Sequence, residues 1–293
     1  MMKRGRVGRS KMKRVFRLMM DPCQVVELKP GLRISVDLRI ANQDSLFWFF
    51  EETEPALQWA MRTLLPIECT FFDVGANAGL MGLLAAQDRN AQVFFVEPHP
   101  RLAETIRTNI GLNHFAHQPH ALEWAASDRD GETQLHFHDR RNDGAHTLKE
   151  FSGSVGATTV QTKRLDGFLQ EMGIGFVDLM KIDAEGHDFE VLAGLGGFLT
   201  PSTLPMIYVE MEHFDKCSQM IWDLLSKRGY VPFSAVSAFI DTLYAFERMQ
   251  EGGMSIAWFQ PVKKLIGGNM LWVERGSGLQ DTLTRNYASA SNR

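Results

Sequence analysis

Cysteine is scarce in this chain and follows no recognisable pattern. Its three cysteines, Cys23, Cys69 and Cys217, lie far apart and lack C-x-x-C spacing. They predict neither a disulfide framework nor a zinc site, and they favour a reducing compartment, which we take to be the cytoplasm. Long apolar runs are also missing, since no stretch approaches the roughly 18 residues that indicate a spanning helix. The remaining composition, 44% apolar and 23% charged over 293 residues, is that of an ordinary globular protein.

Acidic residues are absent from the first 17 positions, which hold eight lysines and arginines. The net charge of −4 for the whole chain therefore leaves −12 on the rest. Residues 1–20 are predicted to form a disordered, solvated leader. The alternative is a polybasic arm that makes peripheral contact with an anionic membrane. The acidic body argues against nucleic acid as a partner.

Strands and helices are predicted to alternate regularly from residue 70 onward. Before that point, residues 25–29 and 32–40 predict a hairpin, and the apolar spacing within 54–65 predicts a helix. Strand-like runs then begin at residue 70 and recur at 93–97, 120–126, 133–138, 158–163, 177–182, 205–210, 255–260 and 269–273.

This alternation predicts an α/β fold with a doubly wound, mostly parallel sheet. We expect residues 21–67 to form an N-terminal extension of that fold and residues 68–275 to form the main domain. Residues 276–293 are small and polar, so they are predicted to be a loose tail.

The strongest motif is FFDVGANAG at residues 71–79, which predicts a strand, a tight turn and the start of a helix. A dinucleotide site would need glycine at Asn77, where the backbone approaches a pyrophosphate, and Asp73 would repel that group. The same acid suits a ligand that carries an ammonium and a sulfonium, such as S-adenosylmethionine. Taken alone, the motif favours a structural turn capped by Asp73 over a ligand site.

Acidic residues end the predicted core strands. An acid at the second strand end, Glu97, can bind both hydroxyls of a ribose, which favours a nucleoside site over a purely structural turn. In an open parallel sheet such positions converge on the edge where ligands bind. Each acid alone is also explained as a helix cap. The strand-end acids are Asp73, Glu97, Asp128, Asp183 and Glu210.

A second motif, VDLMKIDAEGHDFEVLAGL, occupies residues 177–195. Its strand runs into a turn that gathers Lys181, Asp183, Glu185 and His187. Such a set is costly to bury unless it is solvated or functional.

Together with VFFVEPHP at 93–100 and AASDRDG at 125–131, these motifs resemble the FkbM-type family of S-adenosylmethionine-dependent methyltransferases. The resemblance covers roughly residues 68–211. It implies the seven-strand class I methyltransferase fold, S-adenosylmethionine as cofactor, and methyl transfer to oxygen, often a hydroxyl of a sugar or a polyketide-type product.

The resemblance also implies roles for single residues. The glycine turn would hold the methionine end of the cofactor, Glu97 the ribose, and Asp128 would lie beside the adenine amino group. Asp183 would face both cofactor and acceptor. The residues expected to bind the cofactor are Asp73, Gly75, Asn77, Gly79, Glu97, Asp128 and Asp183.

Methyl transfer from a sulfonium needs an in-line acceptor and a base for its hydroxyl proton. We hypothesise that His187 or Asp183 is this base and that Lys181 or Glu185 orients it. The alternative for His187 is a hydrogen bond at a helix N-terminus without chemistry. Asp183 and Glu185 could also ligate a divalent cation, but no third ligand is evident and no metal is predicted.

The acceptor stays open among sugar, lipid-linked glycan, polyketide and small phenol, as does the oligomeric state. Two other functions compete with methyl transfer. One is a nucleotide-dependent oxidoreductase, which Asn77 argues against; the other is a cofactor-binding, non-catalytic partner protein. His136, His138 and His146 are predicted to lie on a solvent face near the substrate mouth. The aromatic residues 47–50 are expected to pack beneath the hairpin or to cover the acceptor pocket.

Overall fold

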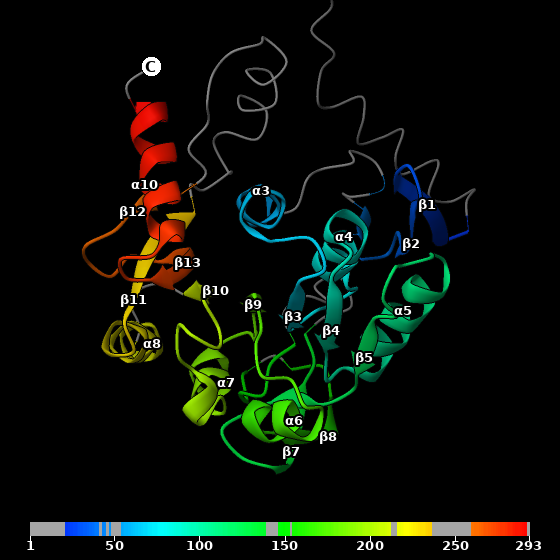
Figure 1. Cartoon of the computed structure of the whole chain (residues 1–293). Helices are drawn as coiled ribbons and strands as arrows, with labels where there is room; N and C mark the ends of the chain where they lie inside the picture. The colour runs from blue at the N-terminus through cyan, green and yellow to red at the C-terminus, as the bar shows by residue number, and fades with distance from the viewer. Residues whose placement is uncertain are drawn as a thin grey trace, which may run out of the picture.

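The structure, a computed structural model, is built around an eight-stranded mixed sheet in the order β12-β11-β13-β10-β9-β3-β4-β5 (Figure 1). The predicted basic leader and residues 48–50 lie outside the part of the chain that the structure describes. The described residues are 21–40, 43–44, 47, 54–138, 146–152, 154–211, 216–235 and 259–291.

Parallel strands form one half of the central sheet. They pair in the order β10 (Met206–Met211), β9 (Leu179–Ile182), β3 (Thr70–Val74), β4 (Gln92–Val96) and β5 (His120–Leu122). Their nearly continuous apolar sequences suit strands that are covered on both faces. Because parallel strands end at the same edge, the residues that follow β3, β4 and β9 are brought together there.

Antiparallel pairing completes the other half. β13 (Gly268–Glu274) lies between β10 and β11 (Tyr230–Ala235), and β12 (Phe259–Pro261) pairs with β11. The predicted α/β fold is confirmed, but the sheet is mixed and has eight strands instead of seven. The strand missed from the sequence is β11, because Pro232 within it argues against a central strand.

Helices cover both faces of the sheet (Figure 1). The first face carries α3 (Pro55–Leu64), α4 (Leu80–Arg89), α5 (Pro100–Gly111) and α10 (Gly278–Ser291). The second carries α6 (Leu165–Glu171), α7 (Asp188–Ala193), the 3-10 turn Gly196–Phe198 and α8 (Lys216–Lys227). Neighbouring residues of one strand therefore belong to different cores, since side chains alternate across the sheet.

Two small sheets flank the central one. The predicted hairpin is confirmed as β1 (Cys23–Lys29) and β2 (Leu32–Asp37), and the helix predicted after it is α3. The second small sheet has the order β6-β8-β7, and β7 and β8 are antiparallel as predicted. Its strands are β6 (Ala125–Ala126), β7 (Gly131–His136) and β8 (Ala157–Lys163).

The strand predicted at 120–126 is divided between two sheets. Its first residues form β5, whereas Ala125 and Ala126 pair with β8 in the small sheet. The bulky Trp124, which is 6% exposed, packs into the second core at the bend between them. Asp128 therefore follows the small sheet, and the prediction that it lies on the central edge is wrong.

The segment 276–293, predicted to be a loose tail, instead contains the helix α10. Leu279 and Leu283 recur at helical spacing, and Leu283 is 1% exposed within the first core. The Ser277 hydroxyl accepts the amide of Gln280 and so begins the helix. The tail was predicted from the small polar residues around these two leucines, which hid the helical spacing. No helix in the described ranges is long and apolar enough to cross a membrane.

Candidate active site

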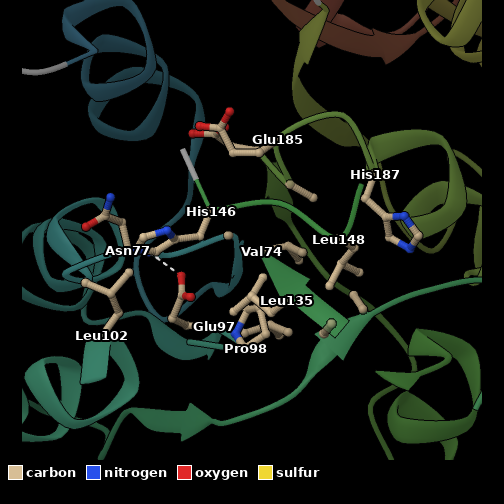
Figure 2. A pocket seen from close by; sticks show the side chains of 16 residues that line it. Val74, Asn77, Glu97, Pro98, Leu102, Leu135, His146, Leu148, Glu185 and His187 are labelled. Carbon is tan, nitrogen blue, oxygen red and sulfur yellow. Dashed lines mark hydrogen bonds between the residues drawn. The ribbon is translucent and has the colours of Figure 1, made fainter. Parts of the chain in front are cut away.

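A cavity opens at the carboxyl edge of the central sheet, where the loops after β3, β4 and β9 meet (Figure 2). Segment 146–149, the strap, contributes His146 and Leu148 to the cavity wall. The Thr147 hydroxyl of the strap donates to the carbonyl oxygen of Glu185 at 2.8 Å. Parts of the central sheet, the small sheet and the strap thus enclose one site.

The loop after β3 approaches the end of β9 so closely that only glycine fits at position 75. Gly75 has φ 71°, and a Cβ there would lie 1.8 Å from the carbonyl oxygen of Asp183. Asn77 is also left-handed, at φ 53°, a conformation that asparagine tolerates. Gly75 and Asn77 line the cavity. Gly79 lies behind it, where a Cβ would come within 3.2 Å of Phe95.

Glu97 follows β4 and is held in the cavity wall by two backbone amides. Its Oε2 accepts from Asn77 N at 2.8 Å and its Oε1 from His99 N at 2.9 Å. The side chain is 6% exposed, and burial raises its pKa to about 7 despite these bonds. Each oxygen keeps a further lone pair. The carboxylate can therefore accept two more hydroxyl donors, as the ribose prediction requires.

Oδ1 of Asn77, a cavity-lining residue, is buried and lacks a hydrogen-bond partner among the described residues. Buried acceptors without donors are costly, so they suit a ligand that brings donors. The apolar side chains of Leu102, Leu135 and Leu148 line the same cavity and suit a flat ring. These residues fit S-adenosylmethionine, a nucleoside that carries a polar methionine tail.

Asp73 is not part of the cavity wall. Its carboxylate is 1% exposed, Oδ2 accepts from Gly82 N at 3.0 Å, and Oδ1 lies 3.8 Å from Lys181 Nζ. Burial raises the pKa of Asp73 to about 6. Asp73 therefore stabilises the first turn of α4 and faces Lys181. Any influence of Asp73 on a ligand in the cavity acts through α4 and Lys181.

Lys181 and Asp183 form the centre of a buried charged cluster. Lys181 lies opposite Tyr208 of β10, and residues two further along each strand, Asp183 and Glu210, share their face. Lys181 Nζ is 3.0 Å from Asp183 Oδ2. Burial favours the neutral form of both groups, but their pairing outweighs it. The pKa of Lys181 is raised well above its ordinary value and that of Asp183 is lowered.

Glu210 makes a side-chain hydrogen bond to Asp183. A bond between two carboxyl groups requires a proton, and burial together with the charge of Asp183 raises the pKa of Glu210 to about 8. At pH 7 Glu210 therefore holds the proton and Asp183 is ionised. Asp183 also lines the cavity, and its predicted role as the base stays a prediction.

His187, the other predicted base, lies across the cavity from Glu97 (Figure 2). Its Nε2 is 3.0 Å from Ser127 Oγ, and its Nδ1 is 3.7 Å from Glu190. Burial lowers the pKa of His187, which favours the neutral ring at pH 7. Its partners are thus groups outside the Lys181 cluster, an arrangement that supports a hydrogen-bonding role more than that of a base.

The turn between β9 and α7 is held by a residue that the sequence prediction overlooked. The Asp188 carboxylate is 5% exposed and accepts the amides of Ala184 at 2.8 Å and Gly186 at 3.1 Å. An acid placed shortly after a glycine turn is the signal for such a local bond. Glu185 lines the cavity and is left-handed at φ 48°, a strained conformation that this bonding maintains.

Asp128 lies at the rim and not in the cavity wall. Its side chain is 44% exposed, and Ser127 Oγ donates to its Oδ1 at 3.2 Å. The predicted contact with adenine stays a prediction. No group of three side chains of the kinds that bind metals is assembled within the described ranges.

A second cavity of about 480 Å³ adjoins the first, and His146 lines both. Its wall contains packed aromatic rings: His99 and His146 are stacked with centroids 4.5 Å apart, whereas the ring of Phe137 is tilted by 41° against His99 at 4.9 Å. Arg101 adds a cation. Of the three histidines predicted near the substrate mouth, His138 and His146 line this cavity and His136 does not.

A residue of the N-terminal extension also reaches the charged cluster, which the sequence did not lead us to expect. Glu54 precedes α3, and its Oε1 lies 4.0 Å from Lys181 Nζ. Lys181 and Asp183 are two residues apart, as are Tyr208 and Glu210. Because side chains alternate along a strand, this spacing is the sequence signal that each pair shares one face of the sheet. No comparable sequence signal links Glu54 to the cluster.

The α/β fold, with a glycine turn after one parallel strand, an acid after the next and an acid at the end of a third, has the arrangement expected of a class I methyltransferase. Sequence comparison makes the assignment specific. A family model described as the methyltransferase FkbM domain matches residues 73–232, more than half of the chain. The chain belongs to the FkbM family of S-adenosylmethionine-dependent methyltransferases.

Curated relatives agree with this assignment. The chain is 30% identical to the 2-O-methyltransferase NoeI of Sinorhizobium fredii, over 60% of this chain and 71% of that protein. It is 27% identical to methyltransferase sdnD of Sordaria araneosa, over 45% of this chain and 62% of that protein.

Solved structures give weaker similarity. A putative O-methyltransferase from Klebsiella pneumoniae superposes with a TM-score of 0.42 and 11% identity, over 78% of this chain and 83% of that one. A precorrin-6y C5,15-methyltransferase from Geobacter metallireducens gives 0.40 and 12%, over 76% and 91%. The family assignment therefore rests on the sequence matches.

Proposed function

We propose that this methyltransferase acts on a hydroxyl oxygen of a sugar, a glycan or a small metabolite. The observation that carries the proposal is the ionised Asp183 carboxylate in the cavity wall, with Glu97 on the wall as the ribose acceptor. Hydroxyl groups need a base, because their oxygen is a weak nucleophile until the proton is removed. The relative named a 2-O-methyltransferase supports oxygen as the acceptor atom.

In this proposal Asp183 takes the hydroxyl proton. When bound, S-adenosylmethionine supplies an activated methyl group, which the acceptor oxygen takes as the carbon–sulfur bond breaks and its electron pair stays on sulfur. Lys181 keeps Asp183 ionised before the reaction. Glu210 already holds its own proton and donates it in the bond to Asp183, which fixes the direction of the carboxylate.

The second cavity supports a ring-shaped acceptor. Its aromatic side chains offer apolar contacts, and Arg101 and His138 add polar groups to the same wall. His146 joins it to the first cavity. Location in the cytoplasm and membrane contact through the basic leader remain predictions.

The first test is calorimetry of the purified protein with S-adenosylhomocysteine and, separately, with NADH. We expect micromolar binding of S-adenosylhomocysteine alone, and loss of binding in Glu97→Ala. Glu104→Ala removes an exposed carboxylate of α5 and should bind normally. Binding of NADH instead, or of neither compound, would overturn the proposed function.

The acceptor is then sought with methyl-labelled S-adenosylmethionine and a panel of oligosaccharides and hydroxylated small molecules. We expect the label on oxygen. Asp183→Asn should lose most of the transfer but keep affinity for S-adenosylhomocysteine. Label on nitrogen or carbon would contradict the proposed acceptor class, and binding without transfer to any acceptor would favour a non-catalytic partner.

A further inference from the structure

The charged cluster beneath the cavity holds more carboxyl groups than cations. Lys181 Nζ lies 4.0 Å from Glu54, 3.8 Å from Asp73 and 3.0 Å from Asp183. It is the only cation that the structure pairs with these acids within the described ranges. Glu210 is neutral because of the proton in its bond to Asp183. Up to three carboxylates consequently surround one ammonium.

Two of these carboxylates have an oxygen with nothing to accept. Oε2 of Glu54 and Oδ1 of Asp73 are buried and lack hydrogen-bond partners among the described residues. Asp73 is itself 1% exposed. Burying excess negative charge is costly unless a cation compensates it. The cluster therefore suits a cationic ligand, and Asp183 connects it to the cavity.

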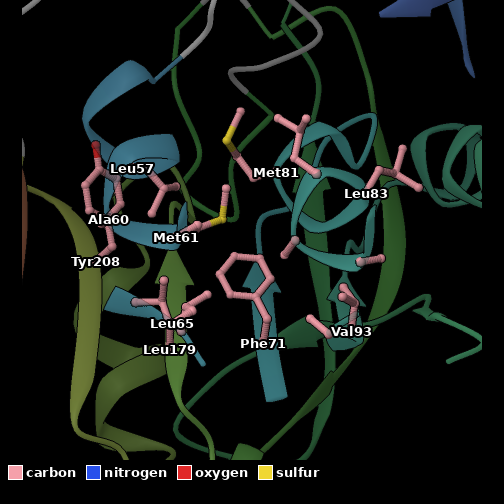
Figure 3. Packing of buried hydrophobic residues seen from close by; sticks show 14 of the residues in the cluster. Leu57, Ala60, Met61, Leu65, Phe71, Met81, Leu83, Val93, Leu179 and Tyr208 are labelled. Carbon is pink, nitrogen blue, oxygen red and sulfur yellow. The ribbon is translucent and has the colours of Figure 1, made fainter. Parts of the chain in front are cut away.

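Glu54 is held against this cluster by the packing of α3. The residue is left-handed, at φ 50°, which is unfavourable for a glutamate, and its carbonyl accepts the first helical amide from Gln58. Figure 3 shows Leu57 and Met61 of α3 in the same apolar core as Phe71 and Tyr208. The packing of α3 therefore holds the Glu54 carboxylate near Lys181, although the backbone of Glu54 is strained.

We propose that Glu54 is a positioning residue: its negative charge helps to attract and hold the positively charged sulfonium of the methyl donor. Acting through Lys181 and Asp183, it contributes to the negative potential that distinguishes S-adenosylmethionine from its neutral thioether product. Glu54 lies outside residues 73–232, which the family model matches. The inference rests on the proposed function, because it takes S-adenosylmethionine as the ligand.

Proton release follows from this arrangement. Burial raises the pKa of Glu54 to about 7, so part of the population is protonated at neutral pH. A nearby cation favours the ionised carboxylate, so binding S-adenosylmethionine at pH 7 releases a proton fraction. The thioether product releases less. The titratable and charged groups that face Glu54 are Asp73 of β3, Lys181 and Asp183 of β9, and Tyr208 of β10, with Glu210 bonded to Asp183.

The experiment compares both ligands with wild type and Glu54→Gln. Calorimetry at pH 7 in two buffers of different ionisation enthalpy gives the affinities and the protons released. In Glu54→Gln the affinity ratio should shift toward S-adenosylhomocysteine by about three- to tenfold, and the extra proton release with S-adenosylmethionine should shrink. The matched control is Glu68→Gln, a carboxylate at φ 63° that is exposed, which should leave both unchanged.

The outcomes separate this inference from the function itself. If wild type binds neither ligand, the proposed function fails. If both ligands bind and Glu54→Gln leaves the affinity ratio and the proton release unchanged, Glu54 has no such role and the function stands. Should Glu54→Gln fail to unfold cooperatively, wild type decides: equal proton release with both ligands overturns the inference.

Discussion

The two ends of the cavity are built in different ways. At the end where we propose that the nucleoside binds (the nucleoside end), both oxygens of Glu97 accept backbone amides, from Asn77 and His99, within one α/β unit. At the end where we propose that the methyl group is transferred (the methyl-transfer end), Lys181 meets side chains that come from positions as distant as Glu54 and Tyr208. The first end is local and uses fixed backbone donors. The second is assembled across the whole chain and carries unbalanced charge.

This difference determines how each end responds to change. A carboxylate held by backbone amides keeps its place when distant side chains are altered. A buried ionic cluster depends on every member, because removing one leaves the others uncompensated in a low-dielectric interior. Substitutions at the methyl-transfer end should therefore cost more stability, and their cost should depend more strongly on pH.

The largest effect is expected for Lys181→Met, which tests whether the cluster is ionic. Removal of the cation leaves Asp73 and Asp183 uncompensated and should lower the free energy of unfolding by about 3–5 kcal/mol. Without Lys181 the raised folded-state pKa of Asp73 rises further and the lowered pKa of Asp183 rises too, so the folded state holds protons that unfolding releases. The loss should therefore be greater at pH 8 than at pH 6.

Urea denaturation at both pH values measures this. Lys163→Met is the control, because Lys163 is exposed on β8 and its loss should change the stability by no more than about 0.5 kcal/mol. Equal stability of Lys181→Met and wild type at pH 8 would show that the cluster is not ionised as described.

Gly75→Ala should disrupt the close contact between the loop after β3, at the nucleoside end, and Asp183, at the methyl-transfer end. The added Cβ would lie 1.8 Å from Asp183 O, at φ 71°, so we expect a loss of about 2 kcal/mol or more and weaker binding of S-adenosylhomocysteine. Thermal unfolding and calorimetry measure the two effects. Gly167→Ala is the control with opposite sign: nothing lies within 4 Å of its added Cβ, and alanine in α6 should stabilise by about 0.5–1 kcal/mol. A tolerated Gly75→Ala would mean that the two loops can separate.

The pH dependence of ligand binding tests whether the ionised form of Glu97 binds the ligand at the nucleoside end. Ribose hydroxyls donate to the ionised form of Glu97, whose pKa is about 7, and protonation competes with them. The affinity for S-adenosylhomocysteine should therefore fall as pH decreases from 8 to 6, by at most about tenfold per unit. Glu97→Gln should bind more weakly at pH 8 and lose most of this dependence. An unchanged pH profile in that variant would assign the titration to another group.

The smallest effect is expected for His187→Ala. Loss of the bond to Ser127 should cost about 1 kcal/mol and change the affinity for S-adenosylhomocysteine only slightly. Because burial lowers the pKa of His187, the unfolded state binds a proton first as pH falls, and wild type loses stability below about pH 6.5. The variant should lack this part of the loss. Normal ligand binding with abolished methyl transfer would instead make His187 the base.

The nucleoside end was largely predictable because its information is local. A strand, a glycine turn and an acid at the next strand end specify the relation of Gly75 to Glu97 in any parallel α/β unit. The side-chain alternation of β9 and β10 would also have placed Glu210 beside Asp183. The position of Glu54 depends on how α3 packs against the sheet, and no spacing in the sequence encodes that contact.

Two elements of the fold were hidden for a similar reason. β11 contains Pro232, which an isolated strand would not favour, and pairing with β13 determines its conformation. The helix α10 contains few apolar residues, and burial of Leu283 against the first core secures it. In both cases tertiary contacts outweigh local preference.

The hydrogen-bond ladder of the central sheet continues past its strand ends into the site. Asp183 N donates to Val74 O at 3.0 Å, Gly75 N to Val96 O at 2.9 Å and Glu97 N to Leu122 O at 3.0 Å. In mechanical terms, the positions that meet the ligand are stiffened by the same lattice that stiffens the strands. Neither end of the cavity can shift without straining that lattice. We therefore expect the cavity to have the same shape with and without a bound ligand, so that binding needs no rearrangement of these loops.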